Sequence, residues 1–225
     1  MKILFKTLLM LCLALASWHA QAQKIPNSNV PFSYFGVGVS AGLTGAGLDV
    51  STNLTKNFQV LLEVNNFQLD NFQQEVTIDD ADILADLSAG LRSYDLKLQY
   101  LPFQRLALKL VGGVSYFNTD VQLIGTYQDE VTYGDVSVDV GQLTAGSTWN
   151  KVIPYVGFGF GRAVPKRKLG LSFDMGIYHM GSPTVSLEGT NLLEPMKSQE
   201  AQLQENLNGY EWYPQMKLRL AYRIN

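Results

Sequence analysis

The stretch from Leu48 to Phe67 constrains the fold most, because it consists of two alternating runs joined by a short polar turn. In its second half, apolar side chains such as Phe58 and Leu62 alternate with polar ones such as Glu63. Successive side chains leave a strand on opposite faces, so this period of two predicts two strands. No segment with helical periodicity lies nearby to cover the apolar faces. The pattern is typical of a strand with lipid on one side and a polar lumen on the other.

The N-terminal segment predicts export. Lys2 and Lys6 precede a short apolar run, and Ala20-Gln21-Ala22 offers a cleavage site between small residues. We therefore predict a signal peptide over residues 1–22 and a mature domain over residues 23–225. The apolar run is shorter than the roughly 20 residues that a membrane-spanning helix needs. Leu11 precedes Cys12 where a lipoprotein signal would have a small residue, so we expect no lipid attachment.

Composition then excludes several classes of function. The predicted mature chain has no cysteine and one histidine, so we expect no disulfide, no metal site and no cofactor. The formal charge of -3 becomes more negative when both lysines of the signal peptide leave. This balance argues against a nucleic-acid partner, which would require a basic surface. The mature chain also has no long apolar run, so any membrane span must be made of strands.

The whole mature chain repeats the alternating pattern. The predicted strands are residues 35–43, 47–54, 58–67, 94–101, 106–117, 152–161, 169–178 and 212–224. Three long polar segments, which we interpret as loops, cover residues 68–93, 118–150 and 179–211. The fold class is therefore all-β, an eight-stranded antiparallel up-and-down transmembrane β-barrel. The strand lengths match the 9–11 tilted residues that cross a bilayer, and closure leaves no backbone group unpaired in lipid.

Charged and aromatic residues sort consistently in this frame. The strand residues predicted to form a charge network in the lumen are Asp49, Glu63, Asp95, Lys97, Lys109, Asp174, Lys217, Arg219 and Arg223. The predicted aromatic girdle, on the apolar faces near the strand ends, is Phe35, Phe58, Tyr94, Tyr100, Tyr116, Phe160, Trp212 and Tyr222. The remaining acids lie in the long loops, whereas the short turns are basic. A soluble barrel, the alternative fold, would instead place its apolar groups inside.

Short patterns accompany this architecture: PYVGFGFGR at residues 154–162, LGLSFDMGIYHMGSP at 169–183 and YPQMKLRLAYRI at 213–224. With them, the chain resembles the small outer-membrane β-barrel proteins of Gram-negative bacteria, the OmpA-transmembrane-like and OmpW-like group. The resemblance implies an outer-membrane location, with short turns in the periplasm and long loops outside the cell. It also implies contact with outer-membrane lipid and lipopolysaccharide, and insertion by the barrel-assembly machinery. Asn225 departs from the group's usual terminal aromatic residue.

Three functional hypotheses follow. The first is a non-enzymatic role in envelope structure or surface interaction, because an eight-stranded barrel has room only for its own side chains. The second is a narrow, porin-like channel for small solutes along the charged lumen. The third is a lipid A-modifying hydrolase that would use His179, Ser182 and Glu188. We also expect a short helix over residues 194–208, and a loop cap over the barrel mouth in which aliphatic residues of 78–87 meet those of 192–207.

Overall fold

The computed structural model describes residues 30–78, 81–103, 106–127, 131–133, 136–138 and 140–225. The predicted signal peptide, residues 1–22, lies outside the described residues. Within these ranges, none of the helices combines the length and the apolar character needed to cross a membrane.

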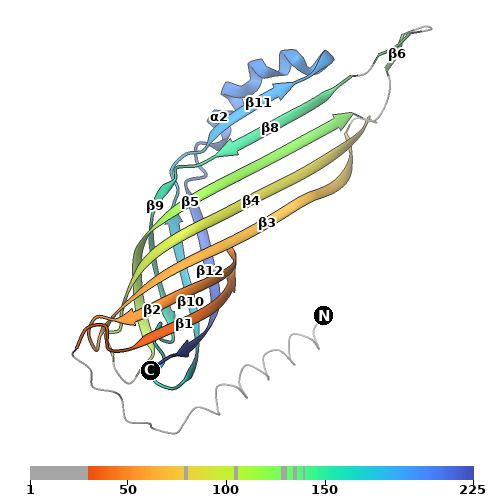
Figure 1. Cartoon of the computed structure of the whole chain (residues 1–225). Coiled ribbons are helices and arrows are strands. Elements are labelled where there is room, and N and C mark those ends of the chain that lie inside the picture. The colour runs from red at the N-terminus through yellow and green to blue at the C-terminus, as the bar shows by residue number, and fades with distance from the viewer. Residues whose placement is uncertain (1–29, 79–80, 104–105, 128–130, 134–135, 139) are drawn as a thin grey trace.

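Eight strands close into a ring, as predicted (Figure 1). The ring strands are β1 (Phe35–Gly42), β2 (Gly45–Asn53), β3 (Phe58–Ile78), β4 (Ala81–Tyr100), β5 (Leu108–Tyr127), β9 (Val152–Phe160), β10 (Leu169–His179) and β12 (Trp212–Arg223). Each pairs antiparallel with its neighbour, and β1 pairs with β12 to complete the barrel. The predicted fold class is therefore confirmed. Closure provides every ring strand with hydrogen-bonding partners on both sides.

The long segments are not simple loops, which corrects the prediction. β3, β4 and β5 run on past the barrel wall, and β8 (Gln142–Thr148) and β11 (Thr184–Gly189) add to β5 to extend the sheet. Figure 1 shows this extension leaving the barrel obliquely. A separate hairpin consists of β6 (Val131–Tyr133) and β7 (Val136–Val138). Segment 68–93, predicted as a loop, is therefore mostly a two-stranded continuation of the barrel wall.

A short helical segment covers the outer edge of the extension. It consists of the 3-10 helix η1 (Asn191–Gln199) and the helix α2 (Glu200–Leu207), and both pack against β11. The side chains of Gln204 and Glu200 accept hydrogen bonds from the backbone N–H groups of Val185 and Leu187, each at 3.0 Å. These contacts satisfy donors that an edge strand would otherwise leave open. The expected helix is present, but it shields a sheet edge and does not cap the barrel mouth.

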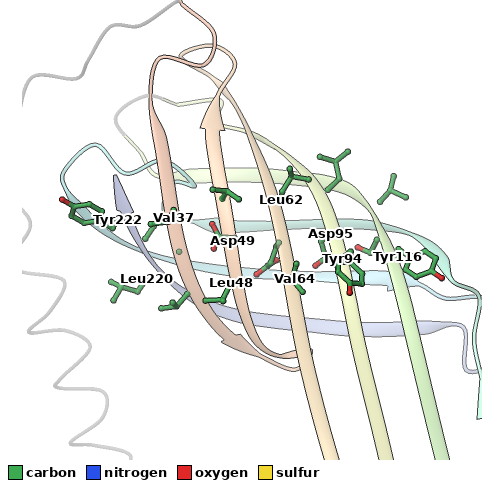
Figure 2. Close-up of a pocket in the computed structure, with 18 of the residues that line it drawn as sticks. Val37, Leu48, Asp49, Leu62, Val64, Tyr94, Asp95, Tyr116, Leu220 and Tyr222 are labelled. Atoms are coloured by element: carbon green, nitrogen blue, oxygen red, sulfur yellow. The ribbon is translucent and has the colours of Figure 1, made fainter. Parts of the chain in front are cut away.

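The barrel is polar inside and apolar outside. Lys109 and Asp95 are buried, with exposed fractions of 0% and 2%, whereas the outward residue Leu48 is 66% exposed. We call the outward apolar side chains of the ring strands the apolar belt; it includes Val37, Leu48, Leu62, Val64, Leu96, Val114, Val156, Leu171 and Leu220. Several of them border the hollow of about 990 Å³ drawn in Figure 2, which the lumen residues Asp49, Glu63 and Asp95 of the same strands also line. This polarity is the reverse of that of a water-soluble protein.

The exposed apolar belt predicts that a charged substitution destabilises the barrel more in the middle of the belt than at its edge. Leu62 lies within the apolar belt, paired with Val50 and Leu96, whereas Leu106 lies in the turn before β5. We expect Leu62→Arg to lower the free energy of unfolding in lipid vesicles by about 2–4 kcal/mol, and Leu106→Arg by about 0–1 kcal/mol. Urea unfolding followed by tryptophan fluorescence measures both. Equal effects at the two positions would contradict a lipid-facing belt.

Candidate functional site

Three carboxylates stand side by side on one wall of the lumen. Asp49 of β2 is in register with Glu63 of β3, and Glu63 is in register with Asp95 of β4. All three are buried. Directly opposed like charges on adjacent strands repel, and an unpaired buried charge is costly. The row is therefore stable only if bases elsewhere in the lumen neutralise it.

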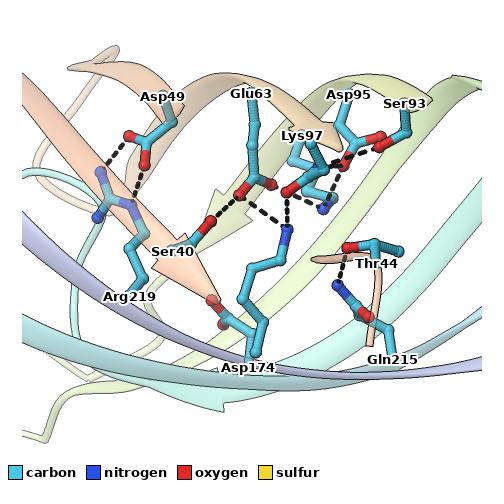
Figure 3. A network of polar contacts seen from close by, with 12 residues as sticks. Ser40, Thr44, Asp49, Glu63, Ser93, Asp95, Lys97, Asp174, Gln215 and Arg219 are labelled. Atoms are coloured by element: carbon cyan, nitrogen blue, oxygen red, sulfur yellow. Dashed lines mark hydrogen bonds and ion pairs between the residues drawn. The ribbon is translucent and has the colours of Figure 1, made fainter. Parts of the chain in front are cut away.

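Arg219 of β12 neutralises the first carboxylate. Its guanidinium binds both oxygens of Asp49 in a bidentate ion pair, with Nε 2.6 Å from Oδ2 (Figure 3). The pair passes over Gly38 of the intervening strand β1, where a Cβ atom would clash with Asp49 Oδ2 and lie 2.8 Å from Arg219 Nε. A glycine at this position therefore leaves the space that the ion pair occupies.

Two lysines neutralise the rest of the row. Lys217 Nζ lies 2.7 Å from one oxygen of Glu63, and Lys97 Nζ lies 3.2 Å from the other. Lys97 also contacts Asp95 at 2.9 Å, and Ser40 donates a hydrogen bond to Glu63 at 2.8 Å. Each carboxylate therefore has a base within ion-pair distance, which offsets its desolvation.

A separate ion pair lies on the facing wall of the lumen. Lys109 Nζ of β5 lies 2.8 Å and 3.0 Å from the two oxygens of Asp174 on β10. Gly159 of β9 stands between them in register, and a Cβ atom there would clash with Asp174 Oδ1. As at Gly38, a missing side chain on the intervening strand gives the pair its space.

The structure thus brings eight of the nine predicted lumen charges into ion pairs. The ninth, Arg223, binds backbone oxygens. Arg223, at the end of β12, donates from Nη1 to the backbone oxygens of Lys166 at 2.6 Å and Pro165 at 3.3 Å. Its guanidinium also lies 5.5 Å from the ring centre of Tyr34. In the described part of the chain it forms no ion pair with an acid. Arg223 therefore holds a turn and does not extend the network.

The connection between β9 and β10 fills the turn-side end of the lumen, which the sequence did not predict. Ala163, Val164 and Pro165 are buried there despite their basic neighbours. Gln59 Oε1 accepts hydrogen bonds from the backbone N–H groups of Ala163 at 2.9 Å and Val164 at 3.3 Å. Arg219 Nη1 donates to the Ala163 oxygen at 3.0 Å. This backbone segment therefore acts as a plug held by lumen side chains.

Aromatic residues fill the loop-side end. Tyr178 is fully buried and contacts the rings of Phe117 and Tyr155 at centroid distances of 4.9 and 4.6 Å. Its hydroxyl group lies 3.1 Å from Lys97 Nζ, so the aromatic cluster and the charge network are joined. The cavity between Glu63, Lys97 and their neighbours measures about 10 Å³, roughly the space of one water molecule. The described lumen is thus packed with side chains.

The eight predicted girdle residues all point outward. They are exposed to between 37% and 58%. Phe58 stacks on Tyr100 at a centroid distance of 4.9 Å near the short turns, and Tyr94 lies 6.4 Å from Tyr116 toward the extension. Aromatic side chains at these two levels bracket the apolar belt. Their position at membrane boundaries stays a prediction.

The predicted hydrolase residues do not assemble as expected. Ser182 donates to the Asn208 oxygen at 3.1 Å and to the Glu211 carboxylate at 3.3 Å, and His179 Nε2 lies 3.7 Å from Glu211. Glu188 lies on β11, in register with Thr144 of β8. Within the described ranges no hydrogen bond joins Ser182 to His179, so the geometry does not activate the serine. Nor do the described residues include a group of three or more potential metal ligands among His, Cys, Asp and Glu.

Ring topology and reversed polarity together define the fold of a small outer-membrane β-barrel protein. The crystal structure of Acinetobacter baumannii CarO matches with a TM-score of 0.56 and 20% identity, covering 86% of this chain and 97% of CarO. The crystal structure of CarO2 of the same species matches with a TM-score of 0.59 and 19% identity, covering 87% of this chain and 100% of CarO2. The crystal structure of a major outer membrane protein from Thermus thermophilus matches with a TM-score of 0.47 and 16% identity, covering 85% of this chain and 98% of that protein.

At these identities, the comparison with CarO and CarO2 supports the fold alone. No protein-family model matches the sequence, and a search of curated proteins gives no match. Function must therefore be argued from the site itself.

The isolated pair of Lys109 and Asp174 allows a direct test of the network. Lys109→Met leaves a buried carboxylate without its base, so we expect it to lower the free energy of unfolding by about 3–5 kcal/mol. The double variant Lys109→Met with Asp174→Leu removes both charges and should recover most of the loss. Urea unfolding in vesicles measures both variants. A single variant as stable as the native protein, or a double variant no better than the single, would contradict a stabilising ion pair.

Proposed function

We propose that this protein is an integral outer-membrane barrel with a non-enzymatic role in envelope structure or surface interaction. The observation that carries the proposal is the reversed polarity of the barrel, with charged residues buried in the lumen and the apolar belt exposed. An exposed apolar surface of this extent is stable only in contact with lipid or another apolar partner. The alternation of short turns with long segments supports an orientation in which the extended sheet lies outside the cell.

The filled lumen supports a structural barrel in preference to an open pore. The plug at residues 163–165 occupies one end, the aromatic cluster around Tyr178 occupies the other, and ion pairs cross the middle. Passage of a solute would require several of these contacts to break together. The ion pairs thus serve to hold the wall, and the extended sheet is the surface available for interaction.

Single-channel recording in planar bilayers tests this proposal. We expect the inserted native protein to give no stable conductance steps, since the described lumen is packed along its length. Lys109→Ala and Arg219→Ala serve as matched variants, because each removes a long lumen side chain from a different ion pair. Stable steps in the native protein, with a size or ion selectivity that these variants change, would favour the channel hypothesis. Failure of the folded protein to insert would contradict the membrane proposal altogether.

A further inference from the structure

A polar hollow of about 380 Å³ lies where the barrel wall passes into the extended sheet. Three adjacent strands line it, mainly with residues of one face that are in register across the sheet. The polar side chains that line this polar hollow are Asn66, Gln68, Asp70, Ser88, Arg92, Asn118, Asp120 and Gln122, and Phe67, Ala89, Gly90 and Leu91 complete the lining. Its volume falls within the range of about 300–1,000 Å³ that is usual for small-molecule sites.

The polar hollow sits directly above the apolar belt. Asn66, Arg92 and Asn118 lie two positions beyond Val64, Tyr94 and Tyr116 toward the extension, so they share the outward face. Below the tyrosine pair come Leu62, Leu96 and Val114 of the same face. The surface therefore changes, over a few residues, from apolar through aromatic to hydrogen-bonding. Such an order complements a molecule with acyl chains and a polar headgroup.

The chemistry of the hollow favours a saccharide over a phosphate. It offers amide groups, two carboxylates and a single guanidinium, that of Arg92. Arg92 Nε makes a long hydrogen bond of 3.4 Å to Asn66, and within the described ranges it forms no ion pair. Hydroxyl groups both donate and accept, so sugar hydroxyls match this mixture of donors and acceptors. Asp70 and Asp120 would repel a phosphate, whereas they can accept hydrogen bonds from hydroxyls.

Gly90 forms the floor of the hollow. It lies in register between Gln68 and Asp120, and a Cβ atom there would meet only the Asp120 oxygen, at 3.8 Å. A side chain at this position would therefore cause no clash with the backbone and would project into the hollow. The absence of a side chain thus maintains the open space without being required by the strand.

We propose that the polar hollow binds the saccharide headgroup of a glycolipid whose acyl chains lie on the apolar belt below it. This inference rests on the proposed function, because an outer leaflet rich in glycolipid faces this level only if the extension lies outside the cell. The tyrosine pair marks the boundary between headgroup and chains. The bound lipid anchors the barrel at a fixed depth and tilt.

Native mass spectrometry of the folded full-length protein in detergent tests the proposal, with a phosphate-free glycosyl diacylglycerol as the probe and phosphatidylglycerol as the comparison lipid. We expect the glycosyl diacylglycerol to bind at least about tenfold more tightly than phosphatidylglycerol. Gly90→Leu should reduce that affinity by about tenfold, because the new side chain fills the hollow. Gly112→Leu is the matched control, since Gly112 also faces outward with nothing within 4 Å of a Cβ atom but lies in the apolar belt.

The outcomes separate the two proposals. Equal binding of both lipids, or undiminished binding of the glycosyl diacylglycerol by folded Gly90→Leu, overturns the glycolipid site while leaving an inserted barrel intact. Full competition by the same sugar without its acyl chains would show a free-sugar site and also overturns the inference. A protein that does not insert into bilayers overturns the proposed function instead. A heat-dependent shift in gel mobility confirms that each variant is folded.

Discussion

The neutralisation of the carboxylate row formed by Asp49, Glu63 and Asp95 is the interaction on which the barrel depends. Three adjacent strands bring these acids into one line, and the alternation that exposes the apolar belt also forces them into the lumen. Two of the bases that neutralise these acids, Lys217 and Arg219, come from β12, which pairs with β1 and so completes the ring. The row is therefore neutralised only when the barrel closes. An open sheet would leave the acids facing one another without Arg219 and Lys217.

This dependence explains the distribution of small residues and the filling of both ends. Gly38 and Gly159 leave space for ion pairs that span an intervening strand. Arg219 then links the network to the plug at residues 163–165, and Lys97 links it to the aromatic cluster through Tyr178. Charge network, plug and cluster thus form one continuous filling. A barrel filled in this way is a stiff support for the sheet that extends from it.

Much of this architecture could be predicted from the sequence, because a lipid-facing barrel repeats one simple pattern. The eight ring strands, their inward charges and their outward aromatic residues follow from alternation alone. The extended part of β3 does not follow from alternation, because polar residues such as Gln73 and Gln74 occupy both faces and a register shift between Leu69 and Phe72 breaks the pattern. The buried plug was missed because its flanking Lys166 and Arg167 suggest a solvated turn. Arg223 was expected in the charge network, but it binds the backbone oxygens of Pro165 and Lys166, because alternation shows which face a side chain takes and not which partner it meets there.

The polar hollow illustrates a further limit of the sequence. Its lining residues lie far apart along the chain and meet only because β3, β4 and β5 stay in register beyond the barrel wall. Gly90 gives no signal in the sequence that distinguishes it from a glycine required by a turn. Only the pairing of the strands shows that its missing side chain opens a space.

Spin-label accessibility in lipid vesicles tests the central claim, the reversed polarity of the barrel, most directly. The only cysteine, Cys12, lies in the predicted signal peptide, so a single cysteine can be placed at Leu62 in the belt or at Gln122 above it. We predict that a label at Leu62 is accessible to oxygen and protected from a water-soluble nickel complex, with the opposite result at Gln122. A label at Leu62 as accessible to nickel as the one at Gln122 would contradict a barrel that faces lipid.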